Sequence, residues 1–152
     1  MILHSLIGQK APYFQAKAAY KTQILESFSL QNYEGKYVVF FFYPLNFTFV
    51  CPTELHAFQE EEEAFSQREA HVVGCSVDSV FSHLAWLSVP RERGGIEGVK
   101  YPIVSDLNKQ IAKEYGVLNE QNEVAYRGLF ILDRQGIIRH LLINDLSIGR
   151  SV

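Results

Sequence analysis

An uninterrupted apolar run, YVVFFFY at residues 37–43, constrains the fold more than any other feature of the chain. Because its apolar residues do not alternate with polar ones, the run predicts a strand that is buried on both faces, as in a parallel sheet covered by helices. Residues 71–77 (HVVGCSV) predict a second such strand, and residues 125–133 and 136–143 a third and a fourth. A short strand is expected at 102–105.

Helical patterns fall between these runs. Residues 52–68 place apolar side chains at helical spacing with Glu and Gln on the other face, and Pro52 suits a first helical turn. Further helices are expected at 81–87 and at 107–115, and a hairpin turn at 133–136. Strands that alternate with helices and then form a hairpin predict an α/β fold with a central mixed sheet flanked by helices.

Length and charge bound the possible functions. The chain has 152 residues and a net charge of −3, which predicts a single domain over residues 1–152 and argues against nucleic acid or an anionic membrane as the main partner. No signal peptide or membrane-spanning run is recognisable, so we expect a cytoplasmic protein with reduced thiols. The chain stops at IGRSV, an unusual close for a compact domain, and we expect that a C-terminal segment is missing.

The sequence places Cys51 where the first buried strand gives way to a helix. A helix start offers unpaired N–H groups and a positive dipole end, both of which favour a thiolate. Glu54 lies where a capping-box carboxylate would reach back to the helix start. The Thr48 hydroxyl, three residues before the cysteine, has the chemistry to donate to the sulfur or to accept from a substrate.

Because a carboxylate disfavours a thiolate, such a site also needs a cation. Arg127, in the otherwise apolar AYRGLF, and Arg150 are candidates. A buried arginine is costly unless it is paired. The residues alone leave alternatives open: Cys51 as a small core side chain, and Arg127 as an ion-paired surface residue.

At this point the chain resembles a known family. PLNFTFVCPTE at residues 44–54 resembles the active-site signature of the peroxiredoxins, Pro-x-x-x-Thr-x-x-Cys, and is most similar to the typical two-cysteine subfamily that includes the bacterial alkyl hydroperoxide reductases. The segments 72–87 (VVGCSVDSVFSHLAWL), 126–133 (YRGLFILD) and 143–151 (INDLSIGRS) resemble family segments in the family's order and spacing.

The resemblance implies a thioredoxin-like fold and a thiol-dependent peroxidase that reduces hydrogen peroxide and organic hydroperoxides through a cysteine sulfenic acid, in antioxidant defence. It makes Cys51 the nucleophile and Thr48 the residue that binds the peroxide. Pro44 would shield the thiol from water. Arg127 would hold the thiolate and stabilise the charge that moves between the oxygens.

Further residues and partners follow from the same resemblance. Glu54 and Arg150 match a supporting polar network, and Trp86 matches an aromatic near the active site, although a core role is an equal alternative. No cofactor or metal is implied. Thioredoxin or a flavoprotein disulfide reductase would be the electron donor, and a homodimer, or a decamer, the assembly.

Two departures from the family pattern stand out. Cys75, the only other cysteine, lies in a predicted strand and is expected to be buried, whereas the family's resolving cysteine lies in a C-terminal segment of the partner subunit. We therefore expect a removed tail or an external resolving thiol. The segment 94–98 (GGIEG) departs from the Gly-Gly-Leu-Gly of members sensitive to overoxidation, which predicts resistance in a full-length parent.

Other function classes fit less well. A thiol–disulfide oxidoreductase would need Cys-x-x-Cys, which is missing at Cys51. A cysteine hydrolase would need a histidine base, and His56 is expected to point away from the first helical turn. The histidines lack metal-ligand spacing. A ring-forming chaperone or scaffold remains an alternative that is compatible with catalysis.

Overall fold

The computed structural model describes residues 5–48 and 50–146. Over these residues seven strands form one mixed sheet in the order β2-β1-β5-β4-β3-β8-β9. Its centre is parallel: β3 (Tyr37–Phe42) pairs with β4 (Ala70–Ser76), and β4 with β5 (Ile103–Ser105). On the outer side of β3, β8 (Arg127–Leu132) and β9 (Ile138–Asn144) add an antiparallel hairpin. The predicted mixed sheet is therefore confirmed.

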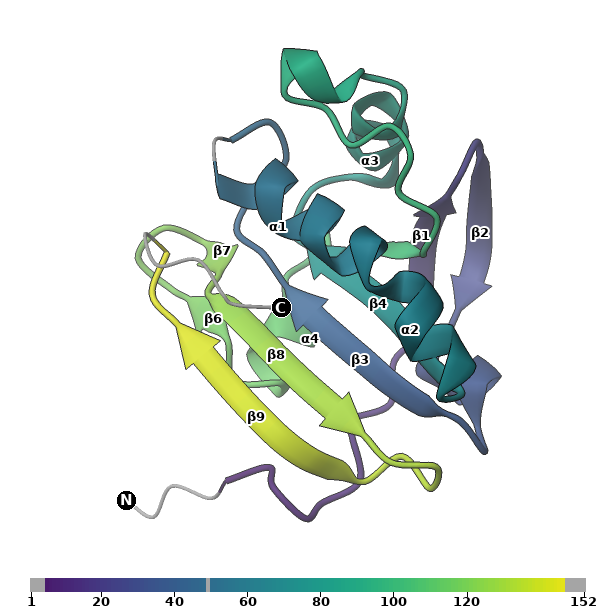
Figure 1. The fold of residues 1–152 in the computed structure, drawn as a ribbon. Helices are drawn as coiled ribbons and strands as arrows, with labels where there is room; N and C mark the ends of the chain where they lie inside the picture. Colours follow the sequence, from purple (N-terminus) through teal and green to yellow (C-terminus); the bar gives the residue numbers. More distant parts are fainter. Residues whose placement is uncertain (1–4, 49, 147–152) are drawn as a thin grey trace.

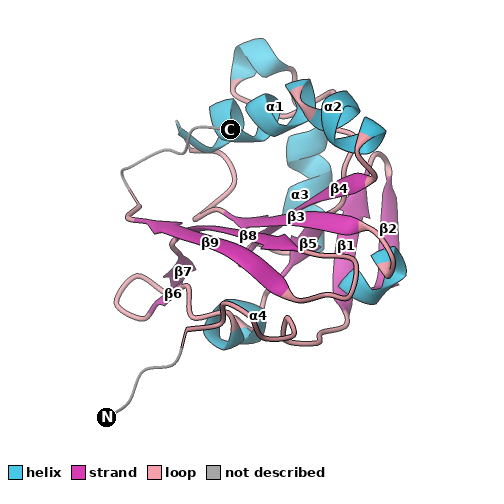
Figure 2. Ribbon diagram, turned by 60° about the horizontal axis from the view of Figure 1, so that its bottom comes forward, coloured by secondary structure: helices cyan, strands magenta, loops and turns pink. Residues whose placement is uncertain are grey.

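Helices cover both faces of this sheet (Figures 1 and 2). One face carries α1 (Val50–Glu60), α2 (Glu62–Gln67) and α3 (Val80–Leu87), and α4 (Gln110–Glu114) lies on the other. The apolar strands supply both cores, because successive side chains of a strand point to opposite faces. In β3, for example, Phe41 joins the core under α1 and α3, while Phe40 and Phe42 join the core around α4.

Several predicted bounds need correction. The single helix expected at 52–68 is two helices, α1 and α2, separated at Glu61, and the first begins at Val50 rather than at Pro52. The helix expected at 107–115 is only the short α4, because Lys109 adopts a left-handed backbone conformation (φ 63°) immediately before it.

The strand expected at 125–133 is also divided. Its first residues form β7 (Val124–Ala125), which pairs with β6 (Leu118–Asn119) in a small separate ladder, and only β8 belongs to the main sheet. The hairpin turn before β9 is confirmed: Asp133 accepts hydrogen bonds from the backbone N–H groups of Gln135 and Ile137, and Gly136 has φ 78°.

An N-terminal hairpin was missed by the sequence analysis. Strands β1 (Ala16–Tyr20) and β2 (Gln23–Phe28) pair antiparallel, and β1 joins the main sheet beside β5. Their sequences, AKAAY and QILESF, contain small and charged residues and are only partly buried, so neither shows a strong apolar pattern. A short 3-10 helix at Leu30–Tyr33 then leads to β3, and a second lies at Arg91–Arg93.

Candidate active site

The centre of the site is Cys51, near the start of α1, the helix that follows β3 in the chain. Because α1 begins at Val50, Cys51 is the second residue of the helix, inside its first turn rather than before it. Backbone N–H groups in the first turn have no partner within the helix, so they are available to donate to a group at this position. The Cys51 side chain has no exposed surface and packs in the core formed with α3.

A buried cation reaches the sulfur from a distant part of the chain. Arg127 is the first residue of β8, the strand beside β3, and is 3% exposed. Its Nη1 group donates to the Cys51 Sγ atom over 3.5 Å. A positively charged donor at this distance stabilises a thiolate more than a neutral thiol, because the attraction exists only for the charged form.

The Arg127 guanidinium has two further partners. Its Nη1 donates to Glu54 Oε1 at 2.5 Å, and its Nε donates to the Leu146 carbonyl at 2.7 Å. Glu54 is 4% exposed and lies three residues after Cys51, which puts both side chains on one face of α1. The arginine inside the apolar strand is therefore paired, as its burial requires, and Glu54 fixes its orientation.

Three other residues were predicted to belong to the site, and they differ in burial and in their contacts. Pro44 is buried directly after Tyr43, at the start of the loop that precedes α1. Thr48 is exposed, and its hydroxyl donates to the Leu45 carbonyl at 3.2 Å, so it lies in the same loop with its hydroxyl engaged locally. Arg150 lies outside the described residues.

Trp86 occupies the border between the site and the core. It is fully buried in α3, its ring centroid lies 5.9 Å from that of Tyr43 and 5.8 Å from that of Phe47, and its indole N–H donates to the Gly94 carbonyl. The side chain therefore packs directly against the loop that leads to Cys51. Trp86 is thus a core residue that also contacts the loop before the helix that carries Cys51.

Cys75 lies on the wrong face of the sheet to meet Cys51. It is fully buried in β4 and belongs to the core around α4, whereas Cys51 belongs to the opposite core. Burial raises the pKa of the Cys75 thiol well above its usual value, and the Asp106 carboxylate raises that pKa further. Cys75 is thus an inert, protonated thiol, and both cysteines are free.

His56 faces away from the thiol, as expected. It is 6% exposed, and its Nε2 atom lies 3.0 Å from the Gly95 carbonyl, so the ring ties α1 to the GGIEG segment. Gly95 has to be glycine there, because a Cβ atom would lie 2.0 Å from the Val89 carbonyl oxygen. His56 therefore engages a backbone carbonyl rather than the Cys51 sulfur.

The sequence analysis missed a buried polar cluster beside the thiol. Tyr43, Asn46 and His83 meet between the loop before α1 and the helix α3, and all three are buried. A signal was available: Asn46 is the single amide in the apolar PLNFTFV, and His83 lies three residues before Trp86 in the apolar helix VFSHLAWL.

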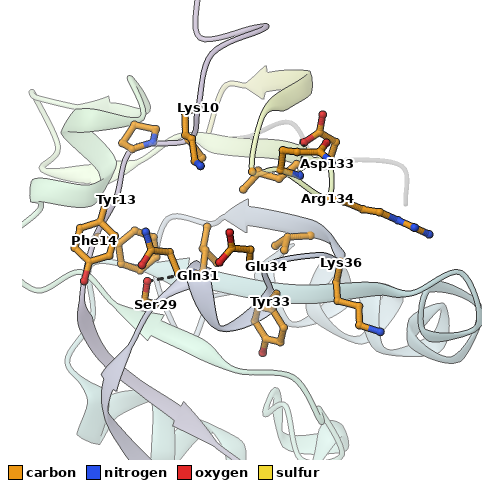
Figure 3. A pocket seen from close by; sticks show the side chains of 17 residues that line it. Lys10, Tyr13, Phe14, Ser29, Gln31, Tyr33, Glu34, Lys36, Asp133 and Arg134 are labelled. Carbon is orange, nitrogen blue, oxygen red and sulfur yellow. Dashed lines mark hydrogen bonds between the residues drawn. The ribbon is translucent and has the colours of Figure 1, made fainter.

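The structure has a separate hollow of about 130 Å³ (Figure 3), which lies at the start of β3, whereas Cys51 follows the end of that strand. Phe14, Tyr33 and Val38 line its apolar part. Arg134 and Lys36 line its rim, but both pair with Glu69 on the outside of the molecule. Two of the three cations that line it, Lys36 and Arg134, are therefore engaged outside it, Lys10 is the third, and the hollow contains none of the site residues.

Residues 5–48 and 50–146 contain no group of three or more histidine, cysteine, aspartate or glutamate side chains that would hold a metal ion. Within the same ranges, no helix has the length and apolar character needed to cross a bilayer.

Comparison with known proteins identifies the architecture. Residues 7–141 match the model of the AhpC/TSA family. Peroxiredoxin-1 of Gallus gallus is 51% identical over 97% of this chain and 74% of its own length, and a thioredoxin peroxidase of Echinococcus granulosus is 47% identical over 97% and 76%.

Solved structures agree with the sequence relatives. The crystal structure of the reduced 2-Cys peroxiredoxin of Plasmodium vivax superposes with a TM-score of 0.93 at 42% identity, covering 98% of this chain and 77% of that one. This likeness confirms the thioredoxin-like fold expected from the sequence. From the match to the family model and from these relatives, the chain belongs to the AhpC/TSA family and is a peroxiredoxin, a thiol-dependent peroxidase.

Proposed function

We propose that Cys51 is the thiol that this peroxidase uses to reduce peroxides, with Arg127 as the residue that stabilises charge. The observation that carries the proposal is the contact between the Arg127 Nη1 group and the Cys51 Sγ atom, 3.5 Å apart, inside the first turn of α1. The arrangement joins a nucleophile, a helix start and a fixed cation, which is what cleavage of an O–O bond needs.

The reaction has a simple balance. The Cys51 thiolate attacks one peroxide oxygen, an S–O bond forms as the O–O bond breaks, and the leaving oxygen takes a proton and departs as water or an alcohol. The sulfur is oxidised to a sulfenic acid and the peroxide is reduced. In this proposal Arg127 donates a hydrogen bond to the oxygen that gains negative charge, Thr48 binds the peroxide, and Pro44 shields the thiolate from water. Glu54, which accepts from Arg127, and Arg150 form a supporting polar network around the helix start.

The second half of the cycle needs a thiol other than Cys75. The burial of Cys75 on the opposite face supports the proposal that resolution comes from outside these 152 residues. A second thiol forms a disulfide with the sulfenic acid and releases water, and a reduced dithiol protein then regenerates Cys51. One relative is named a thioredoxin peroxidase, which supports thioredoxin as that reductant; a flavoprotein disulfide reductase is the alternative.

Self-association through β9 is the assembly that we propose. Among the described residues β9 is the last strand of the sheet (Figure 1). Residues 8–10 bond to its start, at Ile137 and Ile138, and Leu142 and Ile143 farther along it are exposed. An exposed apolar edge favours pairing with a second copy, which would give a homodimer. A second exposed apolar surface, with Phe81 at 67% and Leu107 at 63%, supports a decamer built from such dimers.

We also propose a cytoplasmic location. The proposed cycle requires a reduced Cys51, and reducing compartments keep thiols free. Imaging of the full-length protein in its own cells, with an antibody, tests this proposal; accumulation in an oxidising compartment would contradict it.

Mass spectrometry of the reduced chain after one equivalent of hydrogen peroxide tests the catalytic assignment. In the presence of a sulfenic-acid trap we expect one adduct on Cys51, with Cys75 unmodified. Cys51→Ser should abolish peroxide consumption, and Cys75→Ser serves as the matched control. An adduct confined to Cys75, or undiminished turnover in Cys51→Ser, would overturn the assignment.

A further inference from the structure

The loop that joins β3 to α1, residues 43–48, carries two of the proposed peroxide-site residues, and a buried amide lies between them. Asn46 is 6% exposed and makes four hydrogen bonds. Its backbone N–H donates to Asp78 Oδ2 at 3.0 Å, its Nδ2 donates to Ser82 Oγ at 3.0 Å and to His83 Nδ1 at 2.9 Å, and its Oδ1 accepts from the Tyr43 hydroxyl at 2.6 Å. One side chain therefore ties the loop to α3.

The imidazole of His83 sets the direction of these bonds. It has no exposed surface, and its Nε2 lies 3.0 Å from the Val104 carbonyl, which can only accept. In the neutral ring, Nε2 then carries the proton and Nδ1 is left as an acceptor. Asn46 must turn its NH₂ group, not its carbonyl, toward Nδ1. The tautomer of one buried ring thus fixes the orientation of the amide.

The backbone of this loop adopts an unfavourable conformation at one residue, so its shape depends on contacts with the rest of the fold. Phe47 has φ 62°, in the left-handed region that a side chain with a Cβ atom disfavours. Leu45, Phe47 and Thr48 are exposed, and apart from the contact of the Phe47 ring with Trp86 and the local Thr48–Leu45 hydrogen bond they lie on the surface. The hydrogen bonds of Asn46 join this segment to Asp78 and to Ser82 and His83 of α3.

We propose that Asn46 is a positioning residue for peroxide reduction: with His83 as its partner it fixes the loop that carries Pro44 and Thr48, the two residues proposed to act beside Cys51. The proposal rests on the proposed role of Cys51. Asn46 itself touches no reacting atom, and it acts through the two loop residues on either side of it. A small displacement of binding groups is costly, since about 1 Å of misplacement can reduce a rate on the order of a hundredfold.

The groups that face the His83 ring bear on its protonation. They are the Tyr43 hydroxyl from the end of β3, 3.5 Å from Nδ1, and the Asp78 carboxylate from the loop before α3. Burial lowers the pKa of His83 to about 4, and the Val104 carbonyl and Asp78 oppose this shift without cancelling it. At neutral pH the ring is uncharged and accepts from Asn46; in strong acid it would gain an N–H that points at the amide NH₂.

Three variants test the proposal in the full chain: Asn46→Ala, Asn46→Asp and, as a control, Tyr115→Phe. Tyr115 is 1% exposed and donates its hydroxyl to the Pro12 carbonyl at 2.8 Å, so the control also removes one buried hydrogen bond, but in the core on the other face of the sheet. The readout is the second-order rate of Cys51 oxidation by hydrogen peroxide, with the melting temperature measured in parallel.

We expect Asn46→Ala to slow Cys51 oxidation by about ten- to a hundredfold. Tyr115→Phe should lower the melting temperature without changing that rate. Asn46→Asp should restore most of the rate at neutral pH, because the new carboxylate can accept from a protonated His83 ring. NMR can test whether His83 gains this proton. The ring resonances of His83 should be those of the neutral Nε2–H form in the parent and those of the imidazolium in Asn46→Asp.

The inference is overturned if Asn46→Ala oxidises Cys51 as fast as Tyr115→Phe does, or if Asn46→Asp is as slow as Asn46→Ala while His83 stays neutral. Should Asn46→Ala fail to fold, Ser82→Ala removes one acceptor from the amide, and a several-fold slower rate is then expected; an unchanged rate would count against the proposal. Failure of the proposed function looks different: the parent itself would form no sulfenic acid on Cys51.

Discussion

Replacing Arg127 with glutamine is expected to slow Cys51 oxidation and to destabilise the fold, for two separable reasons. The guanidinium donates both to the Cys51 sulfur at 3.5 Å and to Glu54 at 2.5 Å, in a site where Arg127 and Glu54 are 3% and 4% exposed. Loss of a fixed donor aimed at developing charge costs about 10²- to 10³-fold in rate. Loss of one partner of a buried ion pair costs up to about 3–5 kcal/mol, because the Glu54 carboxylate stays buried and loses the charge of Arg127.

The double variant Arg127→Gln with Glu54→Gln separates these effects. It removes both charges, so much of the lost stability should return, while the rate should stay low because the sulfur still lacks its cation. Stability is measured by urea unfolding, and the rate by stopped-flow reaction with hydrogen peroxide. Arg134→Gln is a matched control, since Arg134 pairs with Glu69 on the surface, and it should change neither quantity appreciably.

One result would refute this reasoning. If the double variant recovers the peroxide rate together with its stability, the only role of Arg127 is to neutralise Glu54. The 3.5 Å contact with the sulfur would then be a consequence of packing. If instead Arg127→Gln is stable but slow, the other contacts of Glu54 are enough to hold its charge, and the stability estimate fails while the catalytic one stands.

Three further expectations follow from the same contacts. Cys75→Ala should leave peroxide reduction unchanged, and in the parent Cys75 should resist alkylation up to pH 9, because burial raises its pKa; rapid labelling in native conditions would contradict this. The fold lowers the pKa of His83 to about 4, so the unfolded chain takes up a proton at this residue before the folded chain does. The free energy of unfolding should therefore be highest above pH 6.5 and fall by on the order of 3 kcal/mol as the pH approaches 4. Urea unfolding at pH 7 and pH 4.5 should show this fall in the parent and a smaller one in His83→Asn. Gly95→Ala should destabilise by about 1–3 kcal/mol, measured by thermal unfolding, because its Cβ would overlap the Val89 carbonyl; an unchanged melting temperature would mean that the segment shifts freely.

Resistance to overoxidation stays a prediction. It was drawn from GGIEG, and the structure adds that this segment is tied to α1 through His56 and to α3 through Trp86. Titration of the full-length protein with excess peroxide during turnover tests it, with sulfinic acid at Cys51 at low equivalents as the contrary outcome.

Much of the fold could be predicted because its core strands carry strong local patterns. The continuous apolar run at 37–43 specifies a strand with two covered faces wherever it is placed. The hairpin β1–β2 was not predicted, because its strands contain small and charged residues and are only partly buried. The helix start was placed two residues late, since a proline suits any position of the first turn and does not mark which one it occupies.

The sequence by itself determined that a thiol lies where a buried strand meets a helix, because periodicity and helix-start chemistry are local properties. Only the tertiary structure decided what that thiol meets. Arg127 is 76 residues from Cys51 in the chain and reaches it because β8 pairs beside β3. Cys75 is excluded because side chains alternate along β4 and its own faces the other core. Likewise Asn46 and His83 meet only because α3 packs against the loop before α1. Sheet register and helix packing bring such distant residues together, and no local sequence pattern specifies which residues will meet.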